Sequence, residues 1–215
     1  PDEDILLIVA DGMGGHNGGE VASKMVVDCL IKAYPSFGAD VGKAFIKTFI
    51  KANRQVYRAA RRNRSLTGMG TTCTALLVRE KQAYCAHVGD SRIYLLRDGV
   101  IYRMTEDHTV LTEKRKKRSN QTSVGNQQEE SSVLTRALGI NCSVEIDTWP
   151  QAFPIKPNDR FLLCTDGLTD LVDDKEIKDT MTAFPLDEVC RRLVQLAKQR
   201  GGFDNISITA AFIGT

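Results

Sequence analysis

The stretch Ile5-Leu6-Leu7-Ile8-Val9-Ala10-Asp11-Gly12-Met13-Gly14-Gly15 joins an uninterrupted apolar run to a glycine-rich loop that opens on an aspartate. The run is short and rich in β-branched residues, so it predicts a buried strand that ends at Asp11. From Glu20 onward, apolar residues recur at helical spacing until Pro35 stops the pattern, which predicts a helix directly after the loop. A strand, a loop that carries a carboxylate and a helix are therefore expected in succession.

Further apolar patterns predict the remaining elements. A second helical pattern covers residues 41–60, and alternating apolar runs separated by turn-like residues predict an antiparallel meander over 71–104. Residues 113–132 combine a basic run with a Ser-, Asn- and Gln-rich stretch, which predicts a mobile surface flap. The later patterns predict strands near 144–149, 160–164 and 206–213, and helices near 174–181 and 186–200.

Composition and charge exclude several classes of protein. The 215 residues, 42% hydrophobic and 26% charged, fit one ordinary globular domain over 1–215. The 29 basic and 27 acidic residues are too balanced for a global nucleic-acid footprint. No apolar run approaches the roughly 20 residues of a membrane span. We therefore expect neither nucleic acid nor a membrane as a partner, and the sequence does not indicate an oligomeric state.

The cysteines and the N-terminal residues give information on the cellular compartment of the protein. The six cysteines are scattered without CxxC pairs, mostly within apolar runs, so we expect reduced thiols and a cytoplasmic protein. The sequence opens Pro-Asp-Glu-Asp, with neither an initiator Met nor an export signal. We expect that residues upstream are missing from it.

Aspartates stand at four expected strand ends. Asp11, Asp90 and Asp166 each follow an apolar run, and Asp204 precedes the last one. Carboxylates on rigid strand ends, with glycine beside them, suit Mg²⁺ or Mn²⁺ if they converge. Taken singly, each is equally compatible with turn chemistry, because Asp-Gly is an ordinary turn dipeptide.

The order of the motifs distinguishes these alternatives. Over about residues 5–213 the chain resembles the metal-dependent protein phosphatase family, the protein phosphatase 2C type, and its compact bacterial members in particular. The motifs that carry the resemblance are Val9-Ala10-Asp11-Gly12-Met13-Gly14-Gly15-His16, Gly68-Met69-Gly70-Thr71-Thr72, Val88-Gly89-Asp90-Ser91-Arg92, Thr135-Arg136-Ala137-Leu138-Gly139, Cys164-Thr165-Asp166-Gly167-Leu168-Thr169-Asp170 and Asp204-Asn205-Ile206.

The resemblance implies a fold and a reaction. The fold is a four-layer α/β/β/α sandwich, with two antiparallel sheets face to face and helices outside. The reaction is hydrolysis of phosphoserine or phosphothreonine in proteins, opposite a Ser/Thr kinase in signal transduction. Two Mn²⁺ or Mg²⁺ ions, with room for a third, would activate a shared water, and the resulting hydroxide would attack phosphorus in line.

The resemblance also assigns roles to residues. It implies that Asp11 bridges two metals, that the Gly12 carbonyl binds one of them, and that Asp166 and Asp204 complete the other. Asp11, Asp166 and Asp204 are thereby the catalytic set. Asp90 is implied to join Asp166 at a third, weaker metal.

Neighbouring polar residues receive supporting roles. Asn205 is expected to shape its turn, and Thr71 and Thr72 to support the metal-bearing strands. Ser91 lacks a positioned base, so we do not expect it to act as a nucleophile. His16, His87 and His108 are the candidate general acids, although a helix-start or surface role is favoured for His16, a structural role for His108 and burial for His87.

Two basic segments have alternative interpretations. Residues 114–118 of the flap either attract phosphopeptides, which would place substrate binding there, or form a solvated loop. Residues 58–64 lie at the expected end of a helix, where the dipole alone favours cations.

One departure from the family pattern leaves a second function open. Family members carry, well upstream of the first Asp-Gly, an Arg that grips the substrate phosphate and an acidic residue that helps bind a metal. Asp2, Glu3 and Asp4 are too close to Asp11 to match the acidic residue, and no Arg precedes them. The alternative function is therefore a catalytically impaired regulatory module that binds phosphoproteins without turnover.

Overall fold

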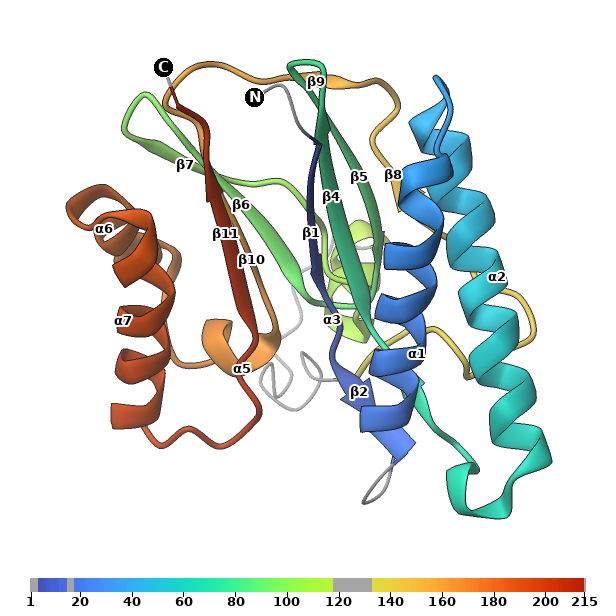
Figure 1. Cartoon of the computed structure of the whole chain (residues 1–215). Coiled ribbons are helices and arrows are strands. Elements are labelled where there is room, and N and C mark those ends of the chain that lie inside the picture. Colours follow the sequence, from blue (N-terminus) through green and yellow to red (C-terminus); the bar gives the residue numbers. More distant parts are fainter. Residues whose placement is uncertain (1–3, 15–17, 118–132, 215) are drawn as a thin grey trace.

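Two antiparallel sheets packed face to face form the centre of the molecule, with helices on both outer surfaces (Figure 1). The computed structural model describes residues 4–14, 18–117 and 133–214. The expected four-layer α/β/β/α sandwich is confirmed. No helix in this described part is both long and apolar enough to cross a membrane.

The first sheet has the order β1-β4-β5-β8. β1 (Ile5–Val9) is the predicted N-terminal strand, and it pairs with β4 (Cys73–Arg79) so that Ile5 faces Val78. β4 pairs in turn with β5 (Gln82–Val88). The short strands β8 (Asp147–Thr148) and β9 (Phe153–Pro154) pair with different parts of β5. The strand expected over 144–149 is therefore limited to β8.

The second sheet has the order β11-β10-β6-β7. Its central strands are β10 (Arg160–Cys164) and β6 (Arg92–Arg97), and its edges are β11 (Ile208–Phe212) and β7 (Val100–Arg103). A separate ribbon joins β2 (Gly12–Met13) to β3 (Gly70–Thr71).

The expectation of one continuous meander over 71–104 is wrong. β4 and β5 belong to the first sheet and β6 and β7 to the second, so the chain crosses between the sheets at residues 89–91. Packing explains the crossing: Leu76 and Cys85 of the first sheet share one apolar cluster with Ile93 and Leu95 of the second. Facing sheets bury these side chains, whereas a single meander would leave them in solvent.

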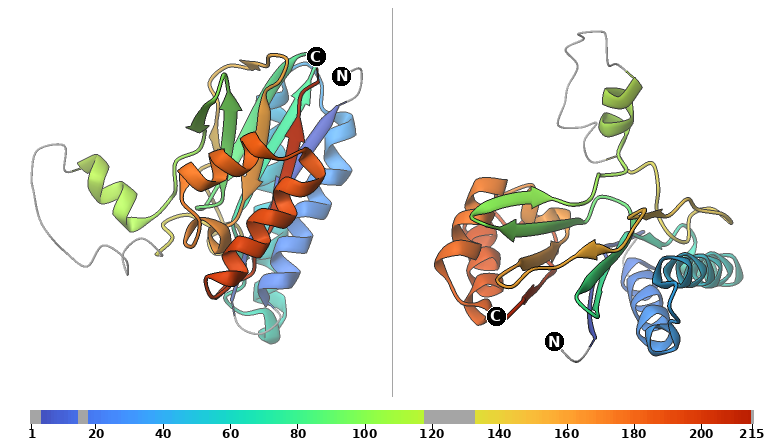
Figure 2. Two further views of the ribbon diagram at one scale, coloured as in Figure 1. Left: turned by 90° about the vertical axis from the view of Figure 1, so that its left-hand side faces the viewer. Right: turned by 90° about the horizontal axis from the view of Figure 1, so that it is seen from above.

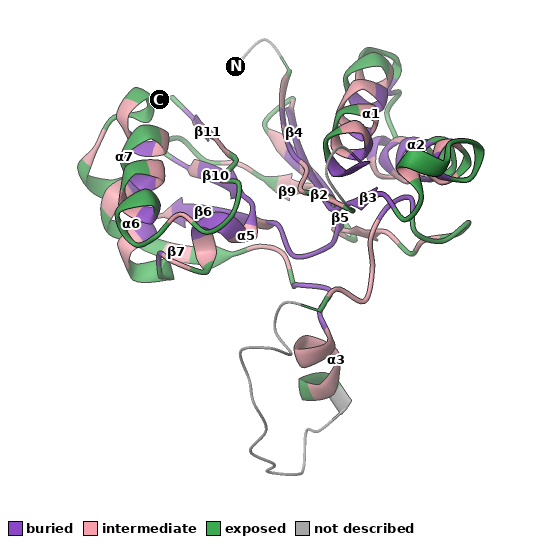
Figure 3. Cartoon of the chain, turned by 90° about the horizontal axis from the view of Figure 1, so that it is seen from below, coloured by how far each residue is buried: buried purple, intermediate pink, exposed green. Residues whose placement is uncertain are grey.

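The outer layers are two pairs of helices (Figure 2). α1 (Gly18–Ala33) and α2 (Val41–Arg62) cover the first sheet, and α6 (Asp174–Ala183) and α7 (Leu186–Gln199) cover the second. Each pair turns its apolar stripe inward, as the burial colours of Figure 3 show. The core is therefore divided into three apolar layers, one between the sheets and one under each helix pair.

Three short helical elements follow other local signals. The single-turn helix α5 (Asp166–Thr169) directly follows β10, and two 3-10 turns, η1 (Tyr34–Ser36) and η2 (Arg64–Leu66), flank α2. α3 (Val110–Lys117) projects from the sandwich (Figure 2). The flap expected over 113–132 thus begins inside a helix, and 118–132 lies outside the described residues.

Candidate metal centre

The topology brings the four predicted aspartates to one end of the sandwich. β1 and β5 are both antiparallel to β4, so Asp11 and Asp90, which follow them, lie at the same end of the first sheet. β10 and β11 are antiparallel, so Asp166 after β10 and Asp204 before β11 share one end of the second. The register of β6 with β10 sets Arg92 opposite Cys164, so Asp90 and Asp166 lie at the same end and the two pairs meet.

Electrostatic coupling shows how close the carboxylates are. Burial, followed by the hydrogen-bonding and charge effects of Asp166 and then the charges of Asp204 and Asp90, raises the pKa of Asp11 to about 8. Burial and the charges of Asp166 and Asp107 raise the pKa of Asp90 to about 7. Crowded acids of this kind favour protons or cations between them.

The residues fit divalent cations. The buried oxygens Asp11 Oδ2 and Asp166 Oδ1 have no hydrogen-bond partner, although buried polar atoms are normally satisfied. Carboxylate oxygens are the ligands that Mg²⁺ and Mn²⁺ prefer. In the described part of the chain no three Asp, Glu, His or Cys side chains already surround a common point. The fit consequently rests on the charge coupling and the unsatisfied oxygens.

Thr71 and Thr72 hold Asp11 in place. The Thr72 amide and the Thr71 hydroxyl both donate to the Asp11 carbonyl at 2.8 Å, and the Asp11 amide donates to the Thr72 hydroxyl at 2.9 Å. The Thr72 hydroxyl also lies 2.8 Å from that of Ser91. This agrees with the supporting role expected for the threonines. Ser91 is fully buried in this network, which agrees with the expectation that it is no nucleophile.

Gly12 is constrained by close packing at the start of α1. A Cβ atom on Gly12 would lie 2.0 Å from the carbonyl oxygen of Gly19, so only glycine allows this approach. The ribbon register places Gly12 opposite Thr71. The loop after Asp11 is thereby fixed between α1 and β3.

A second close approach joins Asp166 to Asp204. A Cβ atom on Gly167 would lie 2.3 Å from the backbone oxygen of Asn205. Thr165 reinforces the contact, because its amide donates to the Ser207 carbonyl at 3.1 Å and its hydroxyl accepts from the Ser207 amide at 3.1 Å. The Asn205 amide donates to Asp204 Oδ1 at 2.6 Å, which fits its expected role in the turn.

The described histidines are buried. His87 is 2% exposed, and burial lowers its pKa to about 4. His108 packs against it with ring centroids 4.7 Å apart, and its Nε2 lies 3.2 Å from Asp147. Their surroundings fit the structural roles expected for them, and His16 lies outside the described residues.

The sequence reasoning missed a cleft of about 160 Å³ beside the aspartates. Asp90 and Asp166 line it together with Asp170, whose pKa is raised by burial and by Asp166. Asp170 stands in the quoted motif after Cys164 and could have been included. Of the other lining residues, Arg92 belongs to the motif at 88–92 and Arg115 to the basic run at 114–118, and only the fold brings them together at this end.

Three arginines also line this cleft. Arg92 and Arg103 both pair with Asp107, at 2.8 and 2.5 Å. Arg115 of α3 also lines the cleft. Thus one residue of the basic run at 114–118 faces the same space as two of the predicted ligands.

Comparisons with known proteins agree with the family resemblance of the sequence. The family model described as "Protein phosphatase 2C" matches residues 1–206. The serine/threonine phosphatase stp of Listeria welshimeri is 35% identical over 213 residues, covering 96% of this chain and 84% of the relative. The protein phosphatase PhpP of Streptococcus pneumoniae is 30% identical, covering 94% and 83%.

Solved structures show the same similarity. The serine/threonine phosphatase PstP/Ppp of Mycobacterium tuberculosis superposes with a TM-score of 0.87 and 32% identity, covering all of this chain and 93% of that one. The catalytic domain of PstP, solved in complex with two manganese ions, has a TM-score of 0.82 and 33% identity, with 99% and 92% covered.

Proposed function

The chain belongs to the protein phosphatase 2C family, and from this premise we propose that it is a metal-dependent enzyme that hydrolyses phosphoserine and phosphothreonine in proteins. Its counterpart would be a Ser/Thr kinase, in cytoplasmic signalling. All six cysteines are free thiols, which fits a reducing compartment.

The observation that carries the proposal is the convergence of Asp11, Asp90, Asp166 and Asp204 from four separate segments. A regulatory module that only binds phosphoproteins has no need of four crowded carboxylates, since their repulsion destabilises the fold. The retained cluster therefore favours the enzyme over the module.

Each residue has a role in the proposed mechanism. Asp11, the Gly12 carbonyl, Asp166 and Asp204 would hold two Mn²⁺ or Mg²⁺ ions, and Asp90 with Asp166 a third. When bound, such ions lower the pKa of water toward neutrality and offset charge on the phosphoryl oxygens. The proposed nucleophile is water, because Ser91 is fully buried and its hydroxyl is hydrogen-bonded to that of Thr72. The proposed proton donor to the leaving group is water, since His87 and His108 are buried and a helix-start or surface role is favoured for His16.

We further propose that α3 contributes to substrate binding. Arg115 lines the cleft beside Asp166, where a guanidinium can offer paired hydrogen bonds to a phosphate or an acidic side chain. Replacing the basic residues 114–118 by Gln should raise KM for a phosphopeptide and leave a small aryl phosphate unaffected. An equal loss on both substrates would contradict this role.

The proposed activity is tested with purified protein in Mn²⁺. Phosphate release from a phosphothreonine peptide and from p-nitrophenyl phosphate is measured for the wild type, Asp166→Asn and Asp98→Asn. Asp98 is a matched control, because it stands in an Asp-Gly turn between β6 and β7 and outside the cluster. We expect Asp166→Asn to lose at least about a hundredfold in kcat and Asp98→Asn to match the wild type. A wild type that binds the peptide but hydrolyses neither substrate would favour the regulatory module.

A further inference from the structure

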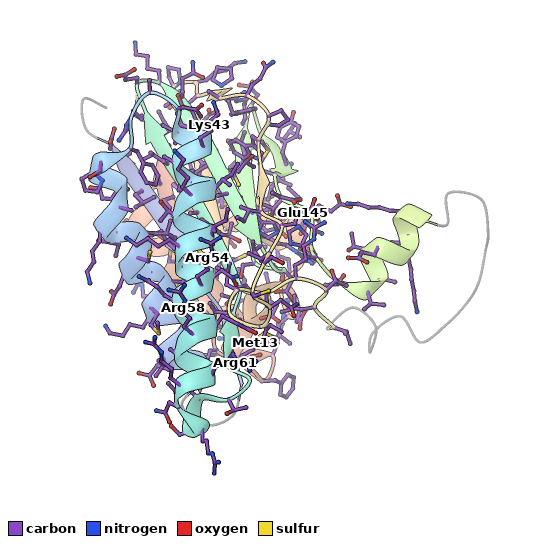
Figure 4. The ribbon with its side chains drawn as sticks, turned by 90° about the vertical axis from the view of Figure 1, so that its right-hand side faces the viewer. Met13, Lys43, Arg54, Arg58, Arg61 and Glu145 are labelled. Atoms are coloured by element: carbon purple, nitrogen blue, oxygen red, sulfur yellow. The ribbon has the colours of Figure 1, made fainter. Side chains whose placement is uncertain are left out.

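Positive charge is concentrated on α2. This helix contains seven of the 29 basic residues and no acidic residue. The other 22 basic residues of the chain stand against 27 acidic ones, so the remainder carries a net charge of −5. A chain that is nearly neutral overall therefore has one strongly basic side. Figure 4 shows Lys43, Arg54, Arg58 and Arg61 following one another along this helix.

A groove of about 650 Å³ lies between α1 and α2. Lys32 of α1 and Lys51, Arg58 and Arg62 of α2 line it, against the single acid Asp28. Within the described ranges none of these four cations makes a salt bridge, and all four are exposed. The groove is therefore positively charged and unneutralised by the chain itself.

Helix electrostatics explain only part of this arrangement. The helix dipole favours cations in the last turn, which accounts for Arg62. Lys32 lies in the last turn of α1 and has the same explanation, but Lys51 and Arg58 precede the last turn of α2 and do not. Moreover, like charges on one face repel each other, so the groove costs stability unless an anion is bound.

The spacing of the cations suits an extended peptide. At 1.5 Å per helical residue, Lys51, Arg58 and Arg62 lie about 10 Å and 6 Å apart along the axis. Side chains on one face of an extended chain are about 6.6 Å apart, and about five residues span the full 16 Å. Met25 and the buried Cys29 give the groove an apolar component against which such a chain can pack.

We propose that the groove between α1 and α2 binds an acidic peptide segment of a partner protein, about five residues long and extended. A nucleic-acid duplex is too wide to enter a groove between two packed helices, and the acidic remainder of the chain repels any larger polyanion or anionic membrane. The inference goes beyond the proposed activity and does not require it.

Direct binding tests the groove. The metal-loaded protein is titrated into a pentaglutamate peptide that carries an uncharged dye, at about 0.1 M salt, and anisotropy is recorded; pentaglutamine is the negative probe. Lys51→Gln/Arg58→Gln/Arg62→Gln is compared with Lys47→Gln/Arg54→Gln/Arg61→Gln. Both triple variants remove one Lys and two Arg from exposed positions of α2, but only the first set lines the groove.

We expect the groove variant to bind pentaglutamate at least about tenfold more weakly than the wild type, because it loses the direct ion pairs with the peptide. The control variant should stay within about threefold of the wild type, because it loses only the screened, longer-range attraction. Unchanged far-ultraviolet circular dichroism and cooperative thermal unfolding of both variants check their folding. The proposal is overturned if the wild type does not bind pentaglutamate, or if both variants lose affinity equally. It is also overturned if a DNA duplex or phosphatidylserine vesicles bind more tightly than the peptide with the same dependence on the groove. Because the probe contains no phosphate, a missing phosphatase activity would leave this outcome unaffected.

Discussion

Asp90 is the aspartate of the cluster whose pKa is raised, in addition to the effect of burial, by Asp107 as well as by Asp166. Its carboxyl is 7% exposed and faces Asp166 as well as the ion-paired Asp107. This position fits the weaker of the proposed metal sites. We expect Asp90→Ala to lower kcat about ten- to a hundredfold while tight binding of two Mn²⁺ ions, measured by calorimetry, remains. Loss of the tight sites would show that our division of ligand roles is wrong.

The burial of His87 makes the stability of the folded chain sensitive to acid. Its Nδ1 lies 2.8 Å from the Thr74 hydroxyl and its Nε2 3.1 Å from the Glu106 carbonyl, in a setting that lowers its pKa from 6.5 to about 4. The unfolded chain therefore takes up the proton first as pH falls. The stability that the neutral ring contributes is complete above pH 6.5 and is lost as pH falls toward 4.

The variant His87→Gln isolates this effect. Between pH 7 and 4.5 the wild type should lose about 2–3 kcal/mol more of its unfolding free energy than the variant, because glutamine does not titrate. Urea unfolding at both pH values, with metal chelated, measures the difference. Parallel losses in the two proteins would show that another group dominates.

At the scale of elements, the junction between α5 and the loop before β11 controls the cluster. Gly167→Ala would place a Cβ atom 2.3 Å from the Asn205 backbone oxygen and must displace the loop that carries Asp204. We expect Mn²⁺ affinity and kcat to fall about a hundredfold, the usual effect of a misplacement of about 1 Å. Gly38→Ala is the control, since a Cβ atom there meets nothing within 4 Å. Retention of both properties by Gly167→Ala would contradict the role of this junction.

Elements whose apolar residues follow a clear helical or strand pattern were predictable from the sequence, and elements fixed by contacts between distant segments were not. The bounds of α2 and β10 lie within a few residues of their patterns at 41–60 and 160–164, because each carries a clear apolar pattern. α3 was missed because its composition is almost wholly polar and charged after Leu111. The crossing at 89–91 was missed because β4 to β7 read locally as successive hairpins, and only burial between the sheets separates them.

The same limit applies to the site. The aspartates were identifiable because each stands next to a recognisable strand and their order resembles one family. The ion pairs of Asp107 with Arg92 and Arg103, and the place of Arg115, depend on segments that meet only in the folded chain. Their residues have no common spacing in the sequence.

For the molecule as a whole, the cluster links metal binding to stability. It joins the two sheets at one end, and without cations the mutual repulsion of Asp11, Asp90, Asp166 and Asp204 opposes folding at neutral pH. A cation that binds only the folded chain stabilises it by about 2.7 kcal/mol at a hundred times its Kd. For a chain of this size that corresponds to a rise in Tm of roughly 5–10 °C.

We therefore predict that Mn²⁺ raises the Tm of the wild type by this amount and that a chelator reverses the rise. Asp11→Asn should have a higher Tm than the wild type in the chelator, because the cost of neutralising this crowded carboxylate on folding is removed, and should respond little to Mn²⁺, because a proposed bridging ligand is lost. Asp98→Asn, at an Asp-Gly turn away from the cluster, should behave as the wild type in both conditions. Scanning calorimetry of the three proteins, each with chelator and with Mn²⁺, provides the comparison. If Mn²⁺ stabilised Asp11→Asn as much as the wild type, the ion would bind elsewhere, and the two sheets would not depend on it at this end.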